Sequence, residues 1–208
     1  ENKIINVPIL ILGAPQLECI EDIIKHDISQ TVFSLEQATL LSIEAVKLGK
    51  KAKIHLAIET GMNRIGIDYH QAGELAKAIC ELPNIVLEGC FSHFATADSA
   101  DKGYAHQQFA KFEQALADIK QAGINIEYRH MANSAAISEM PEMKLDMVRQ
   151  GITLYGIWPS AEVERCVSLQ PVMSLKAKIV WLKEIEADES IGYGRTFTAD
   201  RPAKIATL

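Results

Sequence analysis

The chain has 208 residues, 48% of them hydrophobic and 23% charged, with a formal net charge of −6 at pH 7. This composition is typical of a globular protein that is long enough to bury a core without disulfides or metals. The acidic balance and the lack of a Lys/Arg run argue against a surface for nucleic acid or for anionic membranes, so neither partner is expected.

The cysteines are scattered, with no CxxC pair and no Cys/His spacing suited to zinc; they are Cys19, Cys80, Cys90 and Cys166. This pattern predicts reduced thiols, no metal site and a cytoplasmic location. The longest early apolar run, VPILILG, is too short for a signal peptide or a membrane span. The chain begins at Glu1 and stops within the apolar run KIATL, so we expect it to be a segment of a longer protein.

Short β-rich runs alternate with amphipathic helical stretches over the first 150 residues. The predicted strands are Ile9–Leu12, Thr31–Phe33, Ile54–Glu59, Val86–His93, Ile126–His130 and Asp146–Arg149. The predicted helices are Leu17–Lys25, Leu35–Leu48, Gln71–Glu81, Ala105–Ala122 and the short Ser134–Glu139. The second helix has the clearest ends, because Ser34 and Gln37 have the spacing of a capping box and Gly49 follows its last turn.

Repeated strand–helix units predict an α/β fold with a parallel sheet, and their pattern leaves open whether that sheet is open or closed. No G-x-G-x-x-G or G-x-x-x-x-G-K-[ST] motif follows a strand, which removes the usual reason to assign a Rossmann or P-loop fold. After Pro159 the rhythm changes, and apolar residues alternate from Met173 to Trp181 without an inserted helix. This predicts a separate antiparallel β region, with a boundary near residues 158–170.

Polar side chains collect at four consecutive strand ends, where parallel α/β folds bind ligands. They are Arg64, His93, the pair Asn133 and Ser134, and Arg149 with the neighbouring backbone of Gly151. Each has an ordinary structural explanation when taken alone: a solvated loop arginine, a core histidine or a helix cap. Arg149 is the hardest to explain in this way, because its apolar neighbours leave it little access to water.

Together these residues suit a planar, phosphorylated anion. Ser134 would offer a hydroxyl where backbone N–H groups converge, and Gly151 would let the main chain approach a phosphate closely. The sequence shows no nucleophile beside an obvious base, no metal triad and no carboxylate pair spaced for glycoside chemistry, so no catalytic residue is assigned within it.

Six segments resemble, in order, the signatures of alanine racemase: HLAIETGMNRIGI, SHFATAD, HMANSAA, DMVRQGITLYG, SLKAKIV and IGYGRTFTA. The resemblance extends over nearly the whole chain. It implies a fold-type III pyridoxal 5′-phosphate enzyme that acts as a homodimer. Its parallel TIM-type (β/α)8 barrel would place strands three to eight in residues 1–158, and a linker and the beginning of a C-terminal β domain would occupy residues 159–208.

The resemblance also implies roles for individual residues. Arg149 would donate to the ring nitrogen of the cofactor, with His93 behind it. Ser134 and the backbone of Gly151 and Ile152 would hold the phosphate. Since a guanidinium can only donate, it would leave the ring nitrogen neutral. A carbanion at the substrate's α-carbon would then be short-lived and reprotonated at once, which suits inversion rather than transamination.

Arg64 would reach the phenolic oxygen of the cofactor and the carboxylate region of the substrate. Ala57 stands where many family members carry a carbamylated lysine that steadies this arginine, so an anion such as chloride, or another side chain, is expected there instead. The Schiff-base lysine of the family would lie before Glu1, and its catalytic tyrosine after Leu208. The 208 residues alone are therefore expected to show no racemisation.

The resemblance implies interconversion of L- and D-alanine, which supplies D-alanine for peptidoglycan. A serine or broad-specificity racemase on the same scaffold is an alternative. A decarboxylase is less favoured, because an acidic residue would be expected in place of Arg149. A non-catalytic barrel that carries pyridoxal phosphate would lack the β region from Pro171 onward, and a domain kept for dimerisation or regulation would need no phosphate site.

Overall fold

A computed structural model describes residues 7–208, so the first six residues of the predicted barrel domain lie outside the described residues. The chain divides after Gln170 into two compact units, 1–170 and 171–208, which are considered separately. None of the helices described in residues 7–208 is both long enough and apolar enough to cross a membrane.

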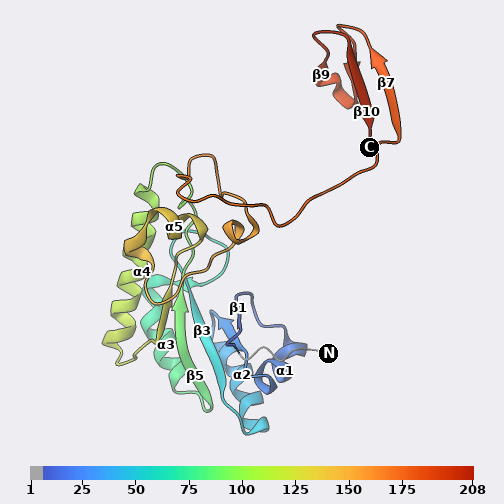
Figure 1. The fold of residues 1–208 in the computed structure, drawn as a ribbon. Helices are drawn as coiled ribbons and strands as arrows, with labels where there is room; N and C mark the ends of the chain where they lie inside the picture. Colours follow the sequence, from blue (N-terminus) through green and yellow to red (C-terminus); the bar gives the residue numbers. More distant parts are fainter. Residues whose placement is uncertain (1–6) are drawn as a thin grey trace. The chain divides into compact units, whose positions relative to one another are not determined.

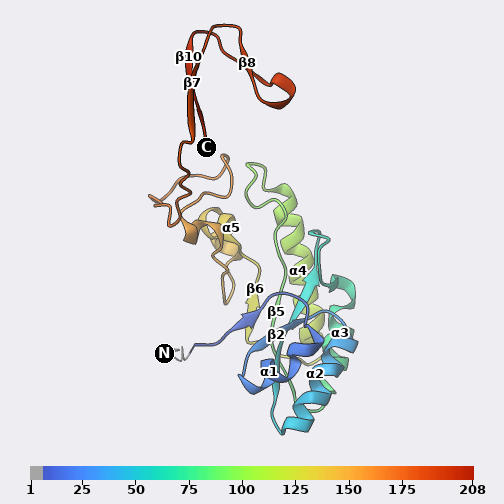
Figure 2. The same ribbon diagram turned by 90° about the vertical axis from the view of Figure 1, so that its right-hand side faces the viewer.

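The first unit is built on a curved, wholly parallel sheet (Figures 1 and 2). Its strands are β1 (Leu10–Ile11), β2 (Ser29–Val32), β3 (Ala52–Glu59), β4 (Ile67–Asp68), β5 (Ile85–Phe91) and β6 (Tyr128–His130). Their order is β1-β2-β3-β5-β6. The short strand β4 stands outside this order and pairs with the last two residues of β3. The parallel α/β prediction is confirmed, and the sheet forms an open half-barrel.

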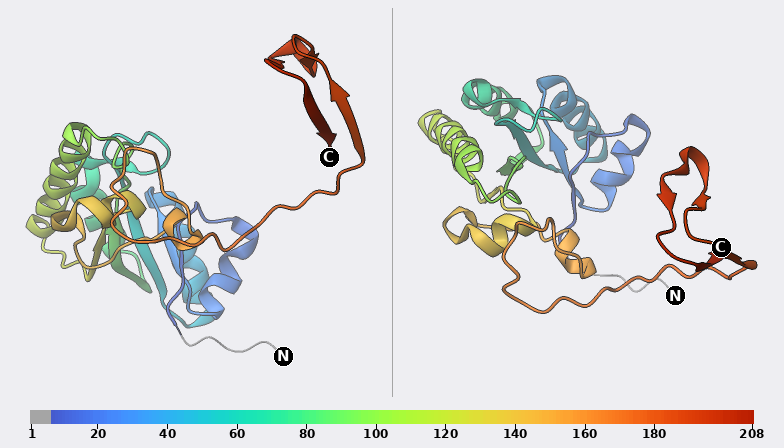
Figure 3. Two further views of the ribbon diagram at one scale, coloured as in Figure 1. Left: turned by 45° about the horizontal axis from the view of Figure 1, so that its top comes forward. Right: turned by 90° about the horizontal axis from the view of Figure 1, so that it is seen from above.

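Helices line the outer side of this half-barrel, as the view from above makes clear (Figure 3). They are α1 (Ile20–Lys25), α2 (Leu35–Leu48), α3 (Ala72–Cys80) and α4 (Gly103–Gln121), followed by the short α5 (Ser134–Glu139). The bounds of α2 and α5 match the prediction. The α2 cap forms as expected, because Ser34 Oγ accepts from the Gln37 N–H at 3.2 Å and Gly49 ends the helix with φ 61°.

Strand β3 separates the apolar core from the concave face of the sheet. Ile54, Leu56 and Ile58 are almost fully buried in the core cluster that joins the sheet to the helices. Side chains alternate along a strand, so His55 and Ala57 point to the opposite, concave face. The fold thus directs polar groups of β3 into the interior of the half-barrel.

Two predicted strands differ from the structure near its functional end. Strand β5 ends at Phe91, which leaves Ser92 and His93 in the following loop. The predicted strand Asp146–Arg149 is wrong: it makes a single bridge, from Met147 to His130. A strand needs a longer ladder than this.

The second unit contains two small antiparallel pairs (Figure 1). Strand β7 (Trp181–Ile185) pairs with β10 (Ala203–Thr207), and β8 (Ser190–Ile191) pairs with β9 (Phe197–Thr198). The antiparallel prediction is confirmed, but the alternating run from Met173 forms no strand before Trp181. Leu175 is 99% exposed, and alternation without a partner strand does not stabilise β structure.

Candidate functional site

A cavity of about 350 Å³ opens where the chain leaves β5 and β6. Five of the six predicted site residues line it: His93, Ser134, Arg149, Gly151 and Ile152. The structure therefore brings together side chains from three segments that are far apart in the sequence. The cavity is hereafter called the arginine pocket.

Arg149 is half-buried, and its guanidinium is held by groups from the two neighbouring strand ends. Nη2 donates to Ser92 O at 2.7 Å and to His93 Nδ1 at 3.1 Å, with Met131 O at 3.4 Å, while Nη1 donates to His130 Nδ1. The guanidinium carbon also lies 5.1 Å from the centre of the Phe91 ring, within cation–π range. The interior arginine thus has partners, which offsets the loss of its hydration.

Burial and the charge of Arg64 lower the pKa of Arg149 to about 10, so the guanidinium stays charged at neutral pH. Burial, with the charges of Arg149 and Arg64, lowers the pKa of His93 to about 4. Burial, and to a lesser extent the charges of Arg149 and His55, lowers the pKa of His130 to about 2. Both imidazoles are therefore neutral near pH 7 and can accept from the arginine.

The acceptor role of His130 determines the direction of a buried hydrogen-bond chain. Because its Nδ1 accepts from Arg149, its proton is on Nε2, which lies 2.9 Å from Nδ1 of His55. The remaining N–H of His55 faces Glu88 Oε1 at 3.5 Å, and this oxygen also accepts from Ser29 Oγ at 2.8 Å. The chain thus connects the charged guanidinium to a carboxylate through two neutral imidazoles.

At the other side of the arginine pocket, Ser134 joins α5 to the segment that follows Arg149. Its Oγ accepts from the N–H of Gly151 at 2.9 Å and of Thr153 at 3.4 Å. The hydroxyl proton remains available to donate to an anion. Asn133, rather than Ser134, caps α5, since its side chain accepts from the Ala136 N–H at 3.2 Å.

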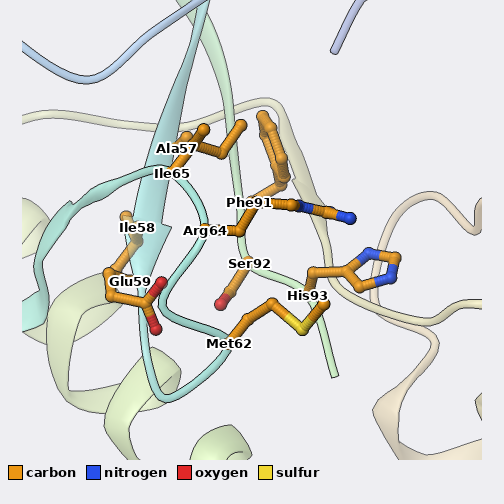
Figure 4. A pocket seen from close by; sticks show the side chains of 9 residues that line it. All are labelled: Ala57, Ile58, Glu59, Met62, Arg64, Ile65, Phe91, Ser92 and His93. Atoms are coloured by element: carbon orange, nitrogen blue, oxygen red, sulfur yellow. The ribbon is translucent and has the colours of Figure 1, made fainter. Parts of the chain in front are cut away.

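Arg64 lines a smaller adjoining cavity, and Met62 and His93 line both cavities. The close view shows its side chain extending from the loop after β3 toward Phe91 and His93 (Figure 4). Ala57 also lines this cavity, whose volume of about 10 Å³ is close to that needed for one water molecule. Within residues 7–208 no ion pair to Arg64 forms, and the group expected to replace the lysine at Ala57 stays a prediction.

Sequence reasoning did not assign His55, His130 or Glu88 to the site. His130 was visible as a polar residue at a strand end, and His55 as the one imidazole within the apolar run of β3. Neither position reveals the contact between them, because they are 75 residues apart. Glu88 lies on β5 and meets His55 of the neighbouring strand β3, close to the register shift between Ile54 and His55.

In chemical terms, the site combines two guanidinium groups, neutral imidazoles and a hydroxyl around the arginine pocket and the smaller cavity beside it. Such an arrangement attracts anions and offers several hydrogen-bond donors, but it holds no cluster of carboxylates, thiols and imidazoles suited to a metal among residues 7–208.

Comparison with known proteins identifies the family. The family model "Alanine racemase, N-terminal domain" matches residues 1–159, and "Alanine racemase, C-terminal domain" matches residues 172–208. The chain is 46% identical over 205 residues to alanine racemase 2 of Caldanaerobacter subterraneus subsp. tengcongensis, with 98% of this chain and 53% of that protein covered. It is 48% identical over 206 residues to the alanine racemase of Clostridium novyi, with the same coverage of 98% and 53%.

A solved structure of alanine racemase from Clostridium difficile 630 superposes with a TM-score of 0.81 at 41% identity, covering 97% of this chain and 53% of that one. The chain thus spans about half the length of the relatives it matches. Two family models together match most of the chain, and these relatives are more than 40% identical to it. The chain belongs to the alanine racemase family.

Proposed function

We propose that the arginine pocket binds pyridoxal 5′-phosphate and that the full-length protein interconverts L- and D-alanine. We further propose a cytoplasmic homodimer that supplies D-alanine for peptidoglycan, as the family resemblance implies. The observation that carries this proposal is the fixed guanidinium of Arg149, held between His93 and His130 at the wall of the cavity.

The residues present fit this cofactor. A guanidinium has five N–H groups. The contacts of Arg149 use one N–H on Nη1 and the two on Nη2, so Nε–H and the second Nη1–H have no partner in the described part of the chain. A heteroaromatic nitrogen needs one such donor. The cavity volume of about 350 Å³ also lies in the range of small-ligand sites.

Pyridoxal phosphate, when bound, withdraws electrons from the α-carbon of an amino acid. Arg149 sets how strongly it does so, because a group with a pKa of about 10 donates at neutral pH and does not protonate a ring nitrogen. His93 and His130 keep the guanidinium in place. Because both rings are neutral near pH 7, they do not draw anions away from the guanidinium. The Ser134 hydroxyl and the backbone of Gly151 and Ile152 would bind the phosphate.

Arg64 gives the pocket a second positive charge. Its guanidinium lowers the pKa of both His93 and Arg149, so its field reaches the same cavity. We propose that Arg64 binds the phenolic oxygen of the cofactor and the carboxylate of the substrate. A positive cavity would also attract these anions before they bind.

The test is to purify the full-length protein with pyridoxal phosphate, supply L-alanine, and measure D-alanine by chiral chromatography. We expect D-alanine to accumulate to near equality with the L isomer, and Arg149→Lys to lower the rate at least about a hundredfold, because lysine lacks the planar donor fork. Arg165→Lys, at an exposed position, should retain the wild-type rate.

Absence of racemisation despite bound cofactor would contradict the proposal and favour a carrier. Faster racemisation of L-serine than of L-alanine would favour the broad-specificity alternative. The 208-residue chain alone should show no turnover, since the family's lysine and tyrosine are expected outside it.

A further inference from the structure

Helix α4 contains a buried amide whose hydrogen bonds all go to two loops beside the arginine pocket. Gln108 is 0% exposed. Its Oε1 accepts from the Ala95 N–H at 2.9 Å, and its Nε2 donates to His93 O at 3.1 Å, with Thr60 Oγ1 at 3.5 Å. A buried amide that loses such partners pays a desolvation penalty, so these contacts fix the loops relative to the helix.

The two loops are also tied to each other. Thr60 Oγ1 and Ser92 Oγ lie 2.7 Å apart, just beyond the ends of β3 and β5, and both residues are at least 97% buried. Tyr104, one turn before Gln108 on α4, donates its hydroxyl to Gly61 O at 3.0 Å. A Cβ atom at Gly61 would lie 2.3 Å from that hydroxyl oxygen, so the loop rests directly on the tyrosine.

These loops carry the charged groups of the pocket. The loop that starts at Thr60 leads to Arg64. The segment clamped by Gln108 provides Ser92 O and His93 Nδ1, two of the acceptors that hold the Arg149 guanidinium. The same face of α4 therefore supports the positions of both guanidinium groups.

We propose that Gln108 is a positioning residue that keeps the His93 segment in the place that orients Arg149, and that Tyr104 does the same for the loop of Arg64. Neither side chain lines the arginine pocket. The proposal rests on the proposed function of the pocket as a pyridoxal phosphate site. It predicts that loss of the clamp releases His93 from Arg149 while the rest of the core stays folded.

The test compares Gln108→Met, which keeps the size of the side chain but removes its hydrogen bonds, with Ile119→Ala as a control. Ile119 is 1% exposed on the same helix, and eleven residues of helix place it about 16 Å further along. Urea unfolding first measures the stability that each variant loses.

The first readout needs no cofactor and is the pKa of His93 followed by NMR. In Gln108→Met we expect it to rise from about 4 toward its usual 6.5, because the ring gains access to water and moves away from the guanidinium charge. The Ile119→Ala control should leave it near the wild-type value.

The second readout is the dissociation constant of pyridoxal phosphate in the full-length protein. We expect it to rise roughly tenfold in Gln108→Met, as for the loss of one buried hydrogen-bonded contact, and to stay unchanged in Ile119→Ala. Gln108→Glu should lie between Met and wild type, since a buried, protonated carboxyl can both accept from Ala95 and donate to His93 O.

An unchanged His93 pKa and affinity in Gln108→Met would overturn the proposal, as would equal shifts in the Ile119→Ala control. If the wild-type protein binds no pyridoxal phosphate, the proposed function fails, while the His93 titration still decides the role of Gln108. If Gln108→Met does not fold, Tyr104→Phe decides: it removes one hydroxyl from the same face and should weaken cofactor binding about threefold, and unchanged binding would overturn the proposal.

Discussion

The Nε2 atom of His130 lies 2.9 Å from the Nδ1 atom of His55, although the two histidines come from strands that are not neighbours in the sequence. The other ring nitrogen of His130 accepts from Arg149, so the proton of the His130 ring is on Nε2 and points to His55. The orientation of the arginine in the pocket thus depends on a residue buried deeper in the half-barrel.

Replacing His55 tests this dependence. His55→Leu removes the buried acceptor of the His130 N–H, so we expect the free energy of unfolding at pH 7 to fall by about 1–3 kcal/mol in urea denaturation. His26→Leu, which changes an exposed histidine, should alter it by less than about 0.5 kcal/mol. Equal losses in the two variants would show that the His55–His130 contact contributes no stability.

Gly89 leaves the space that the His55 ring occupies. A Cβ atom at this position would lie 2.2 Å from two atoms of that ring. Gly89→Ala should therefore displace His55 and cost about 1–3 kcal/mol of unfolding free energy, the usual range for overpacking. Gly13→Ala is the matched control, because its Cβ would meet nothing within 4 Å. A Gly89→Ala variant as stable as Gly13→Ala would mean that His55 lies elsewhere.

The buried histidines predict a loss of stability in acid. The folded-state pKa values of His93 and His130, about 4 and about 2, lie below the usual 6.5. The unfolded chain therefore binds these protons at a higher pH than the folded chain. The stabilisation is complete above about pH 6.5 and declines as the pH falls toward 4, by up to about 1.4 kcal/mol per pH unit for each histidine.

Urea unfolding at pH 7, 6 and 5 measures this slope. Since several carboxylates contribute a slope of the same sign at lower pH, His93→Gln is the informative variant: it removes one titrating group but keeps an acceptor for Arg149. A smaller slope in His93→Gln between pH 6.5 and 5 is expected. A slope identical to wild type would rule out the lowered pKa of His93.

Ser134 tests the phosphate end of the pocket. Ser134→Ala removes a hydroxyl that can donate to the phosphate, so the dissociation constant of pyridoxal phosphate should rise roughly tenfold in fluorescence titrations. Ser138→Ala, on the same short helix, loses only a bond to the Ser134 carbonyl at 3.2 Å and should bind normally. Normal binding by Ser134→Ala would remove this residue from the site.

The elements that were predicted to the residue are those whose ends are specified locally. Ser34, Gln37 and Gly49 mark both ends of α2 within the sequence itself. The segment around Met147 looked like a strand by alternation, but a strand is defined by its partner, and here the pairing with His130 is one residue long. Alternation alone does not report the length of a ladder.

The candidate site was predictable to the extent that parallel strands bring their carboxyl ends together. Arg149, His93 and Ser134 could be placed side by side on that basis. Gln108 could not, because in the sequence it is one of two adjacent glutamines beside Phe109 on a helix and its partners are loop atoms. Glu88 could not either, because its contacts are with His55 and Ser29 on two other strands.

In the proposed site, the Arg149 guanidinium faces the ring nitrogen of pyridoxal phosphate and leaves it unprotonated. The most direct measurement is the nitrogen-15 NMR shift of the ring nitrogen in cofactor labelled at that atom and bound to the full-length protein. We expect the shift of an unprotonated pyridine nitrogen throughout pH 6–9. The shift of a protonated nitrogen at neutral pH, unchanged in Arg149→Lys, would contradict it.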